Sequence, residues 1–165
     1  MKLNLSTTKL ARAGIISALY AAVSFISAPI ASGAIQIRLS EALCLLPLIF
    51  PESILGLTIG CALSNLITGL APYDVIFGSL ITLIASVFTY LCGKIIKKDS
   101  LKIFIGGLFP VLLNAFFLPL IWKWCYGFIE YVYLLQVLFL IIGQGVSVYA
   151  IGTPLYFIAK KNFIN

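Results

Sequence analysis

The chain has 165 residues, of which 62% are hydrophobic and 10% are charged, and its mean hydropathy is +1.14. A soluble domain is typically about 45–50% apolar and about 25% charged, so these few charges could not solvate a globule of this size. A soluble enzyme, a nucleic-acid-binding protein and a disordered tail are therefore excluded, and an integral membrane protein is predicted. The sequence also lacks histidine, which argues against hydrolytic, zinc and Ser-His chemistry.

Long apolar runs predict membrane-spanning helices, because a helix needs about 20 residues to cross the hydrocarbon core alone. They lie near residues 10–31, 53–70, 75–93, 103–121 and 132–159. The first is expected to be a span, not a cleaved signal, because it lacks a clear small-residue cleavage site. A further apolar piece, 39–51, contains Pro47 and would reach only about 18–20 Å as an α-helix.

The positive charges decide the status of the short segment. Basic residues form islands near the N-terminus, at Lys94–Lys102 and at Lys160–Lys161, as cytoplasmic segments do under the positive-inside rule. The number of crossings between the first two islands must be even, which requires the segment 39–51 to count as one. We therefore predict an all-α, integral membrane bundle of six transmembrane helices, with both termini cytoplasmic and a short second helix that is kinked at its proline. Residues 1–165 are expected to form one domain.

The first predicted span carries small residues, Gly14, Ala18 and Ala22, at i, i+4 and i+8. Such a stripe lets two helix backbones approach closely. The pattern alone favours packing inside the bundle, with a docking surface for another membrane protein as the alternative. Gly56 and Gly60 have the same spacing in the third span, where packing inside the bundle is predicted.

Some charged residues lie outside the basic islands, and ionisable groups near a bilayer are costly unless they are paired or used. They are Arg38, Glu41, Glu52, Asp74, Lys123 and Glu130. All except Glu52 fall at the outer ends of helices in the predicted topology. Glu52 follows Pro51 on the inner side, where a carboxylate would oppose the positive end of the next helix. The outer charges therefore indicate a polar site at the extracellular end.

Amides and aromatic residues accompany the outer charges in three separate segments. The candidate ligand-binding residues are Gln36, Arg38, Glu41, Asn65, Asp74, Asn114, Trp122, Trp124, Tyr126, Glu130 and Gln136. Aromatic faces stack on planar rings, while carboxylates and amides orient a ring through its donors and acceptors. This convergence predicts an outward-facing site for a flat, polar solute, in which Asn114 could form the floor.

Structural interpretations of the same residues stay open. Tryptophan and tyrosine are enriched at membrane interfaces, so any one of these aromatics could belong to an interfacial belt. Ser40 with Glu41, and also Asp74, would be reasonable N-terminal caps of the helices that follow. Arg38 could simply pair with Glu41.

The sequence also lacks motifs of catalysis and energy conversion. It has no G-x-x-x-x-G-K-[ST] phosphate loop, no residues for a carboxylate-rich metal site, and no chain of acidic residues that would relay ions across the membrane. We therefore expect a binding protein without enzyme activity, cofactor or metal, which needs a partner to move its solute.

Two stretches of the chain resemble the QueT family. They are QIRLSEALCLLPLIFPE at Gln36–Glu52 and PYDVIFGSL at Pro72–Leu80. Members of this family are regarded as substrate-binding S components of energy-coupling factor (ECF) transporters, associated with the uptake of queuosine precursors. The similarity has clear motifs up to about residue 93 and is looser after it.

The resemblance implies six helices, cytoplasmic termini and a substrate site near the extracellular face of what is expected to be a bacterial plasma membrane. It implies that the first helix contacts a transmembrane coupling subunit through an A-x-x-x-A-like motif. Gly14, Ala18 and Ala22 match this motif with one glycine in place of alanine. ATP hydrolysis would belong to two separate ATPase subunits, and the S component would topple in the membrane to release its cargo.

The implied ligand is a 7-deazaguanine base, such as queuine or its aminomethyl precursor. Its ring N–H and exocyclic amine are adjacent donors, which Glu41 could accept in bidentate fashion. Asp74 or Glu130 could meet a cationic aminomethyl group. Arg38 or an amide could donate to the ring carbonyl, and an aromatic residue of 122–126 could stack on the ring.

Two other functions stay open. An S component for a different vitamin-like cofactor precursor would share the topology and differ in its pocket residues. A non-transport membrane enzyme or assembly factor would need a catalytic constellation that the sequence does not contain.

Overall fold

A computed structural model describes residues 6–31, 35–69, 72–127 and 131–163, and all regular structure in these ranges is helical. In chain order the elements are α1 (Thr7–Ala31), the 3₁₀ helix η1 (Leu39–Leu48), α2 (Ser53–Ile67), the π-helical η2 (Asp74–Gly78), α3 (Ser79–Ile95), α4 (Asp99–Tyr126), α5 (Tyr133–Gly145), the π-helical η3 (Val146–Ile151) and α6 (Gly152–Phe163). η2 continues directly into α3, and α5, η3 and α6 form one continuous rod. The prediction of six helices is therefore confirmed.

Four of the rods are long and apolar enough to cross a membrane. They are Thr7–Ala31, Asp74–Ile95, Asp99–Tyr126 and Tyr133–Phe163. η1 and α2 are shorter apolar helices, and the 15 residues of α2 reach about 22 Å. The chain is thus a multi-pass membrane protein, with two of its six helices shorter than the hydrocarbon core of about 30 Å.

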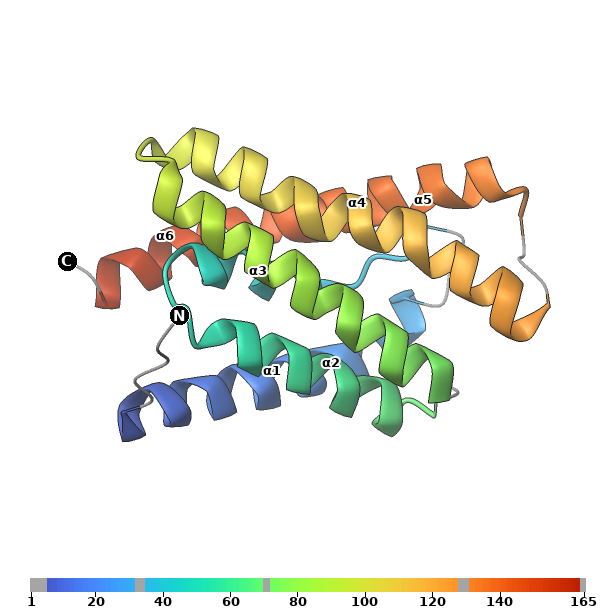
Figure 1. Cartoon of the computed structure of the whole chain (residues 1–165), viewed down its shortest axis with the longest axis horizontal. Helices are drawn as coiled ribbons and strands as arrows, with labels where there is room; N and C mark the ends of the chain where they lie inside the picture. The colour runs from blue at the N-terminus through green and yellow to red at the C-terminus, as the bar shows by residue number, and fades with distance from the viewer. Residues whose placement is uncertain (1–5, 32–34, 70–71, 128–130, 164–165) are drawn as a thin grey trace.

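α1 begins and α6 ends at the same end of the bundle, where α3 also turns back into α4 (Figure 1). Several contacts hold this end together, two of which join α6 to other parts of the chain. Lys160 Nζ donates to Asp99 Oδ2 at 2.5 Å, and the Phe163 ring meets that of Phe50 edge to face, with centroids 5.7 Å apart. The basic islands therefore share one end, here called the basic end, as the charge-parity argument requires. That this end faces the cytoplasm stays a prediction.

η1 runs through the middle of the bundle and contacts every one of α1, α2, α3, α4 and α6. Nine of its ten residues are buried. Its backbone lies against glycines of neighbouring helices, because a Cβ on Gly93 would lie 2.6 Å from the Leu48 carbonyl oxygen and one on Gly152 would lie 2.7 Å from that of Ala42. The predicted short second helix is therefore a central element of the bundle.

The geometry of η1 differs from the prediction. A short α-helix kinked at Pro47 was expected, whereas Leu39–Leu48 is a 3₁₀ helix that includes this proline. In an α-helix the proline ring would clash with the carbonyl group four residues earlier. The 3₁₀ geometry also rises about 2.0 Å per residue, so ten residues reach about 20 Å, against about 15 Å for an α-helix.

α1 and α2 pack through the glycine pair of α2. A Cβ on Gly56 would lie 2.7 Å from the Ala13 carbonyl oxygen, and one on Gly60 would lie 2.8 Å from Tyr20 Cβ. The predicted internal packing of this pair is confirmed. Substituents larger than hydrogen at either position would force the two helices apart.

The small-residue stripe of α1 does not pack inside the described part of the bundle. Gly14, Ala18 and Ala22 are all exposed, and a Cβ added to Gly14 would meet nothing within 4 Å. The internal-packing interpretation of this stripe is therefore wrong. The face is available for a contact outside the chain.

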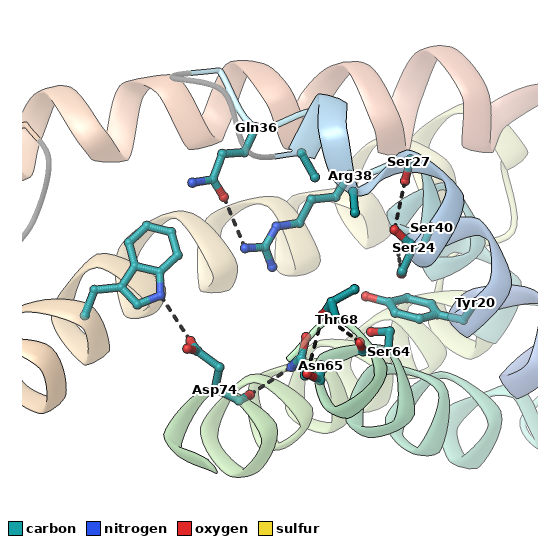
Figure 2. Close-up of a pocket in the computed structure, with 13 residues that line it drawn as sticks. Tyr20, Ser24, Ser27, Gln36, Arg38, Ser40, Ser64, Asn65, Thr68 and Asp74 are labelled. Atoms are coloured by element: carbon teal, nitrogen blue, oxygen red, sulfur yellow. Dashed lines mark hydrogen bonds between the residues drawn. The ribbon is translucent and has the colours of Figure 1, made fainter. Parts of the chain in front are cut away.

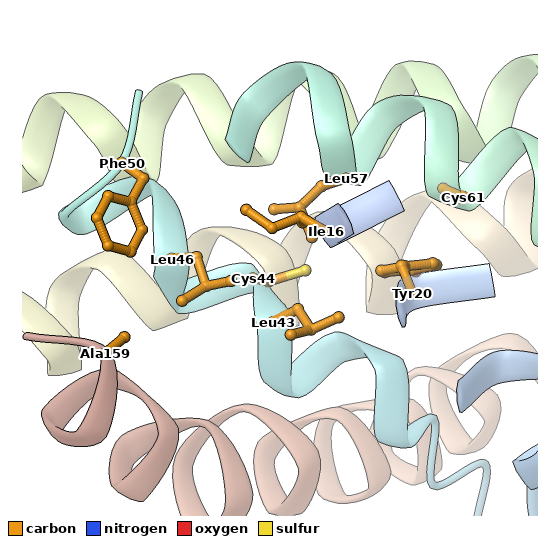
Figure 3. Close-up of a cluster of buried hydrophobic side chains, with 9 residues drawn as sticks. All are labelled: Ile16, Tyr20, Leu43, Cys44, Leu46, Phe50, Leu57, Cys61 and Ala159. Carbon is orange, nitrogen blue, oxygen red and sulfur yellow. The ribbon is translucent and has the colours of Figure 1, made fainter. Parts of the chain in front are cut away.

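A buried cluster joins α1, η1 and α2 at the level of the glycine pair (Figure 3). Ile16 and Tyr20 of α1 meet Leu57 and Cys61 of α2 and Cys44 of η1. Lipid tails are as apolar as this cluster, so close packing rather than removal from water stabilises it in a bilayer.

Glu52 forms an ion pair with Arg12, a residue that is distant in the sequence. It is 2% exposed and accepts a hydrogen bond from Arg12 Nη1 at 2.5 Å. The Arg12 guanidinium also lies over the Phe50 ring, 4.4 Å from its centroid. Glu52 precedes α2 but makes no capping hydrogen bond to that helix. Its observed role is therefore to join the start of α2 to α1.

Candidate functional site

A cavity of about 330 Å³ lies between α1, α2, α4 and the segment before η1 (Figure 2). It is near the ends of these helices that are far from the basic end. Its lining residues are Tyr20, Ser24, Ser27, Ala28, Ala31, Gln36, Arg38, Ser40, Ser64, Asn65, Thr68, Asp74 and Trp122. Ligand pockets typically have about 300–1,000 Å³. The cavity therefore has room for a small molecule.

Asp74 is the carboxylate among the described residues of the cavity wall, and two donors hold its side chain. It is 8% exposed, and it accepts hydrogen bonds from Trp122 Nε1 at 3.1 Å and from the Tyr126 hydroxyl at 2.5 Å. Asn65 Nδ2 donates to the backbone carbonyl of Asp74 at 2.9 Å. Each carboxylate oxygen has two lone pairs, so the group can still accept hydrogen bonds from a ligand.

Arg38 extends from the segment before η1 into the cavity (Figure 2). Its Nη2 donates to Gln36 Oε1 at 3.1 Å, which is a neutral partner. None of the ion pairs among the described residues includes Arg38, so the alternative pairing with Glu41 is not observed. Its remaining donors are available to an acceptor in the cavity. Asp74, Arg38 and the indole of Trp122 together form what we call the charged end.

Hydroxyl groups line the opposite side of the cavity (Figure 2). They belong to Ser24, Ser27, Ser40, Ser64 and Thr68. We call this group the hydroxyl end. These residues are not among the candidates predicted from the sequence, because serine and threonine within an apolar span are hard to distinguish from packing residues.

Glu41 lies beside the cavity, not in its wall. It is 2% exposed and accepts hydrogen bonds from the Tyr20 hydroxyl at 2.7 Å and from Cys44 Sγ at 3.0 Å. Glu41 and Asn114 border a recess of about 10 Å³, which is about the space of one water molecule. The recess and the cavity share Arg38, Asn65 and Asp74. Direct contact of Glu41 with a ligand stays a prediction.

Helix capping does not account for the polar residues of the site. The starts of η1 and η2 have no side-chain capping hydrogen bond. Ser40 instead accepts a hydrogen bond from Ser24 of α1, and Asp74 accepts from two residues of α4. These polar groups connect different elements around the cavity.

The remaining candidates lie elsewhere. Trp124 is 80% exposed and outside the cavity lining, as an interfacial belt residue would be. Tyr126 contacts the site through Asp74, whereas Gln136 is buried in α5 outside the lining. Glu130 lies outside the described residues. Among the residues that are described, no group of three His, Cys, Asp or Glu side chains could hold a metal ion.

Comparisons with known proteins give one match. A family model described as QueT transporter matches residues 10–161. The chain matches none of the curated proteins and none of the solved structures with which it was compared. The matched range includes η1, the cavity and most of every helix.

Proposed function

Because the chain belongs to the QueT transporter family, we propose that it is the substrate-binding S component of an ECF-type ABC importer in the cell membrane. The chain is a transport protein with a small-molecule substrate, not an enzyme. It captures a queuosine precursor, a 7-deazaguanine base, at the outer face and delivers it to the cytoplasm. A transmembrane coupling subunit and two ATPase subunits supply the energy.

The observation that carries this proposal is the charged end of the cavity, where a carboxylate and a guanidinium lie on opposite sides of one space (Figure 2). A deazaguanine ring has an N–H and an exocyclic amine beside its carbonyl group. Asp74 accepts from the two donors and Arg38 donates to the carbonyl, so one edge of the ring satisfies both. Charge-assisted hydrogen bonds of this kind contribute about 1.5–3 kcal/mol each.

The structure changes which carboxylate is proposed for the donor edge. Glu41 was the first choice from the motif, but it borders the small recess and does not line the cavity. Asp74 lines the cavity itself and has its orientation fixed by Trp122 and Tyr126. We therefore assign the ring donors to Asp74, with Glu41 positioning Tyr20 in the cavity wall.

A calorimetric titration of the purified protein tests this function. Queuine or its aminomethyl precursor should bind with nanomolar to low micromolar affinity. Absence of heat with both bases, together with binding of another vitamin-like compound in a parallel screen, would replace the proposed ligand and leave the fold unaffected.

The exposed stripe of α1 is proposed as the contact with the coupling subunit. Replacing Ala18 and Ala22 by leucine should abolish uptake into cells, because bulky side chains keep two helix backbones apart. Ligand binding by the purified protein should stay within about twofold of the native value, since neither residue lines the cavity. Uptake and binding are measured on the same variant.

Ala150→Leu is the matched control for the stripe, because Ala150 is an exposed alanine on another rod of the bundle. It should leave both uptake and binding unchanged. An equal loss of binding and uptake in the α1 variant would show that the stripe supports the fold rather than a partner.

A further inference from the structure

The hydroxyl end of the cavity has an uneven supply of hydrogen-bonding groups. Ser27 Oγ donates to the Val23 carbonyl at 2.7 Å, and Ser64 Oγ donates to that of Cys61 at 2.9 Å. Thr68 Oγ1 donates to the Ser64 carbonyl at 2.7 Å. A hydroxyl has one hydrogen and two lone pairs. These three oxygens have therefore used their hydrogens on their own helices and can only accept from a ligand.

The remaining two hydroxyls are bonded to each other across elements. Ser24 Oγ of α1 donates to Ser40 Oγ of η1 at 2.7 Å. This bond uses one of the two hydrogens, so the pair has a single hydrogen left. The hydroxyl end as a whole is thus rich in acceptors and poor in donors.

This end is also neutral. The charged residues among the described lining are Arg38 and Asp74, and both lie at the charged end (Figure 2). A carboxylate or phosphate group has only acceptor oxygens and would face the lone pairs of Ser27, Ser64 and Thr68. A purely apolar group would leave these lone pairs without donors.

We infer that the hydroxyl end is a second subsite, which binds the hydroxylated end of a ligand's side arm through the arm's own O–H groups. The inference rests on the proposed function, because it assumes that a deazaguanine ring occupies the charged end. The substituent of a 7-deazaguanine is on the five-membered ring, beside the carbonyl group and on the side of the ring opposite the exocyclic amine. With the amine at Asp74, such an arm is directed toward the hydroxyl end of the cavity.

The subsite distinguishes between two forms of the proposed ligand. Queuine carries a cyclopentene diol on its aminomethyl nitrogen, and each diol O–H is a donor. The aminomethyl precursor ends at the nitrogen and carries no diol. Water would therefore fill the hydroxyl end of the cavity when this base is bound. The cavity should therefore prefer the base with the hydroxylated arm.

Calorimetry with both bases on the native protein and on Thr68→Val tests the inference. Valine has nearly the shape of threonine and removes one acceptor. The native protein should bind queuine at least about fivefold more tightly than the aminomethyl base. Thr68→Val should weaken queuine binding about five- to tenfold, the effect of one lost hydrogen bond, and should change the affinity for the aminomethyl base by less than twofold.

Thr58→Val is the matched control. Thr58 lies on α2, the helix whose C-cap is Thr68, and it donates to the carbonyl four residues earlier in the same way, but outside the cavity. It should leave both affinities unchanged. Equal native affinities for the two bases, or an equal effect of Thr68→Val on both, would overturn the subsite and leave the proposed function standing. Binding of neither base would overturn both proposals.

Discussion

Replacing Arg12 by methionine is expected to destabilise the folded protein by about 3 kcal/mol, measured by thermal unfolding in detergent micelles. The change leaves Glu52, which is 2% exposed, without its cationic partner. Removing one member of a buried ion pair typically costs about 3–5 kcal/mol. The lower part of this range applies because Arg12 itself is 29% exposed, so water can partly replace it. The contact with the Phe50 ring is lost as well.

Two further variants separate charge pairing from packing. Lys9→Met removes a cation from an exposed position one turn earlier on α1 and should change the melting temperature little. The double variant Arg12→Met, Glu52→Gln leaves no unpaired charge, so it should be more stable than Arg12→Met alone. A double variant as unstable as the single one would show that the packing of Arg12 on Phe50, not its charge, holds this end.

The number of helices could be predicted from the sequence because charge parity is a property of the whole chain. Lys94–Lys102 and Lys160–Lys161 had to share an end with the N-terminal cations, and this forced the segment 39–51 to be counted. The geometry of that segment could not be predicted. Its backbone lies in the centre against Gly93 and Gly152 of other helices, and these close contacts have no local signal in the segment.

The polar site was predictable in part. Gln36, Arg38, Asn65, Asp74 and Trp122 were proposed from their outer positions, and the structure brings them together around one cavity. Their contact with a ligand stays a prediction. Charged loop residues are conspicuous in an apolar sequence. A charge near a bilayer is costly unless it is paired or used, so each of them indicates a partner or a site.

The rest of the site depends on partners that are distant in sequence. Glu41 is bonded to Tyr20 of α1, and Glu52 is paired with Arg12 of the same helix. The two carboxylates follow similar local patterns, so local capping rules could be applied to both. Neither pairing has a local signal, because only the packing of α1 beside η1 and α2 brings the partners into contact.

The hydroxyl end was missed for a different reason. Ser24 and Ser27 of α1 are three residues apart, and Ser64 of α2 is four residues before the C-cap residue Thr68, which places each pair on one helical face. This spacing was the available signal. It is weak because such residues also satisfy their hydroxyls on their own helix within apolar spans, as three of these four do.

Asp74→Asn is expected to weaken binding of the deazaguanine base about 10- to 100-fold, measured by calorimetry. The asparagine keeps the shape of the side chain, but it loses the charge and presents an N–H₂ group where one acceptor oxygen was. The lost charge-assisted contact corresponds to about 1.5–3 kcal/mol. Trp122→Phe should have a smaller effect, because it keeps an aromatic ring in the cavity wall and the Asp74 carboxylate, and removes the donor that orients that carboxylate.

Asp99→Asn is the matched control for this change. Asp99 also accepts from a tyrosine hydroxyl, that of Tyr156 at 2.9 Å, and from Lys160, but it lies at the basic end of the bundle. The control should lower the melting temperature without changing the affinity for the base, whereas Asp74→Asn should change the affinity most. If Asp74→Asn lowered the melting temperature and left the affinity intact, Asp74 would serve only to join η2 to α4. The donor edge of the base would then have to reach Glu41 through the recess beside Arg38, and Glu41→Gln would become the variant that weakens binding.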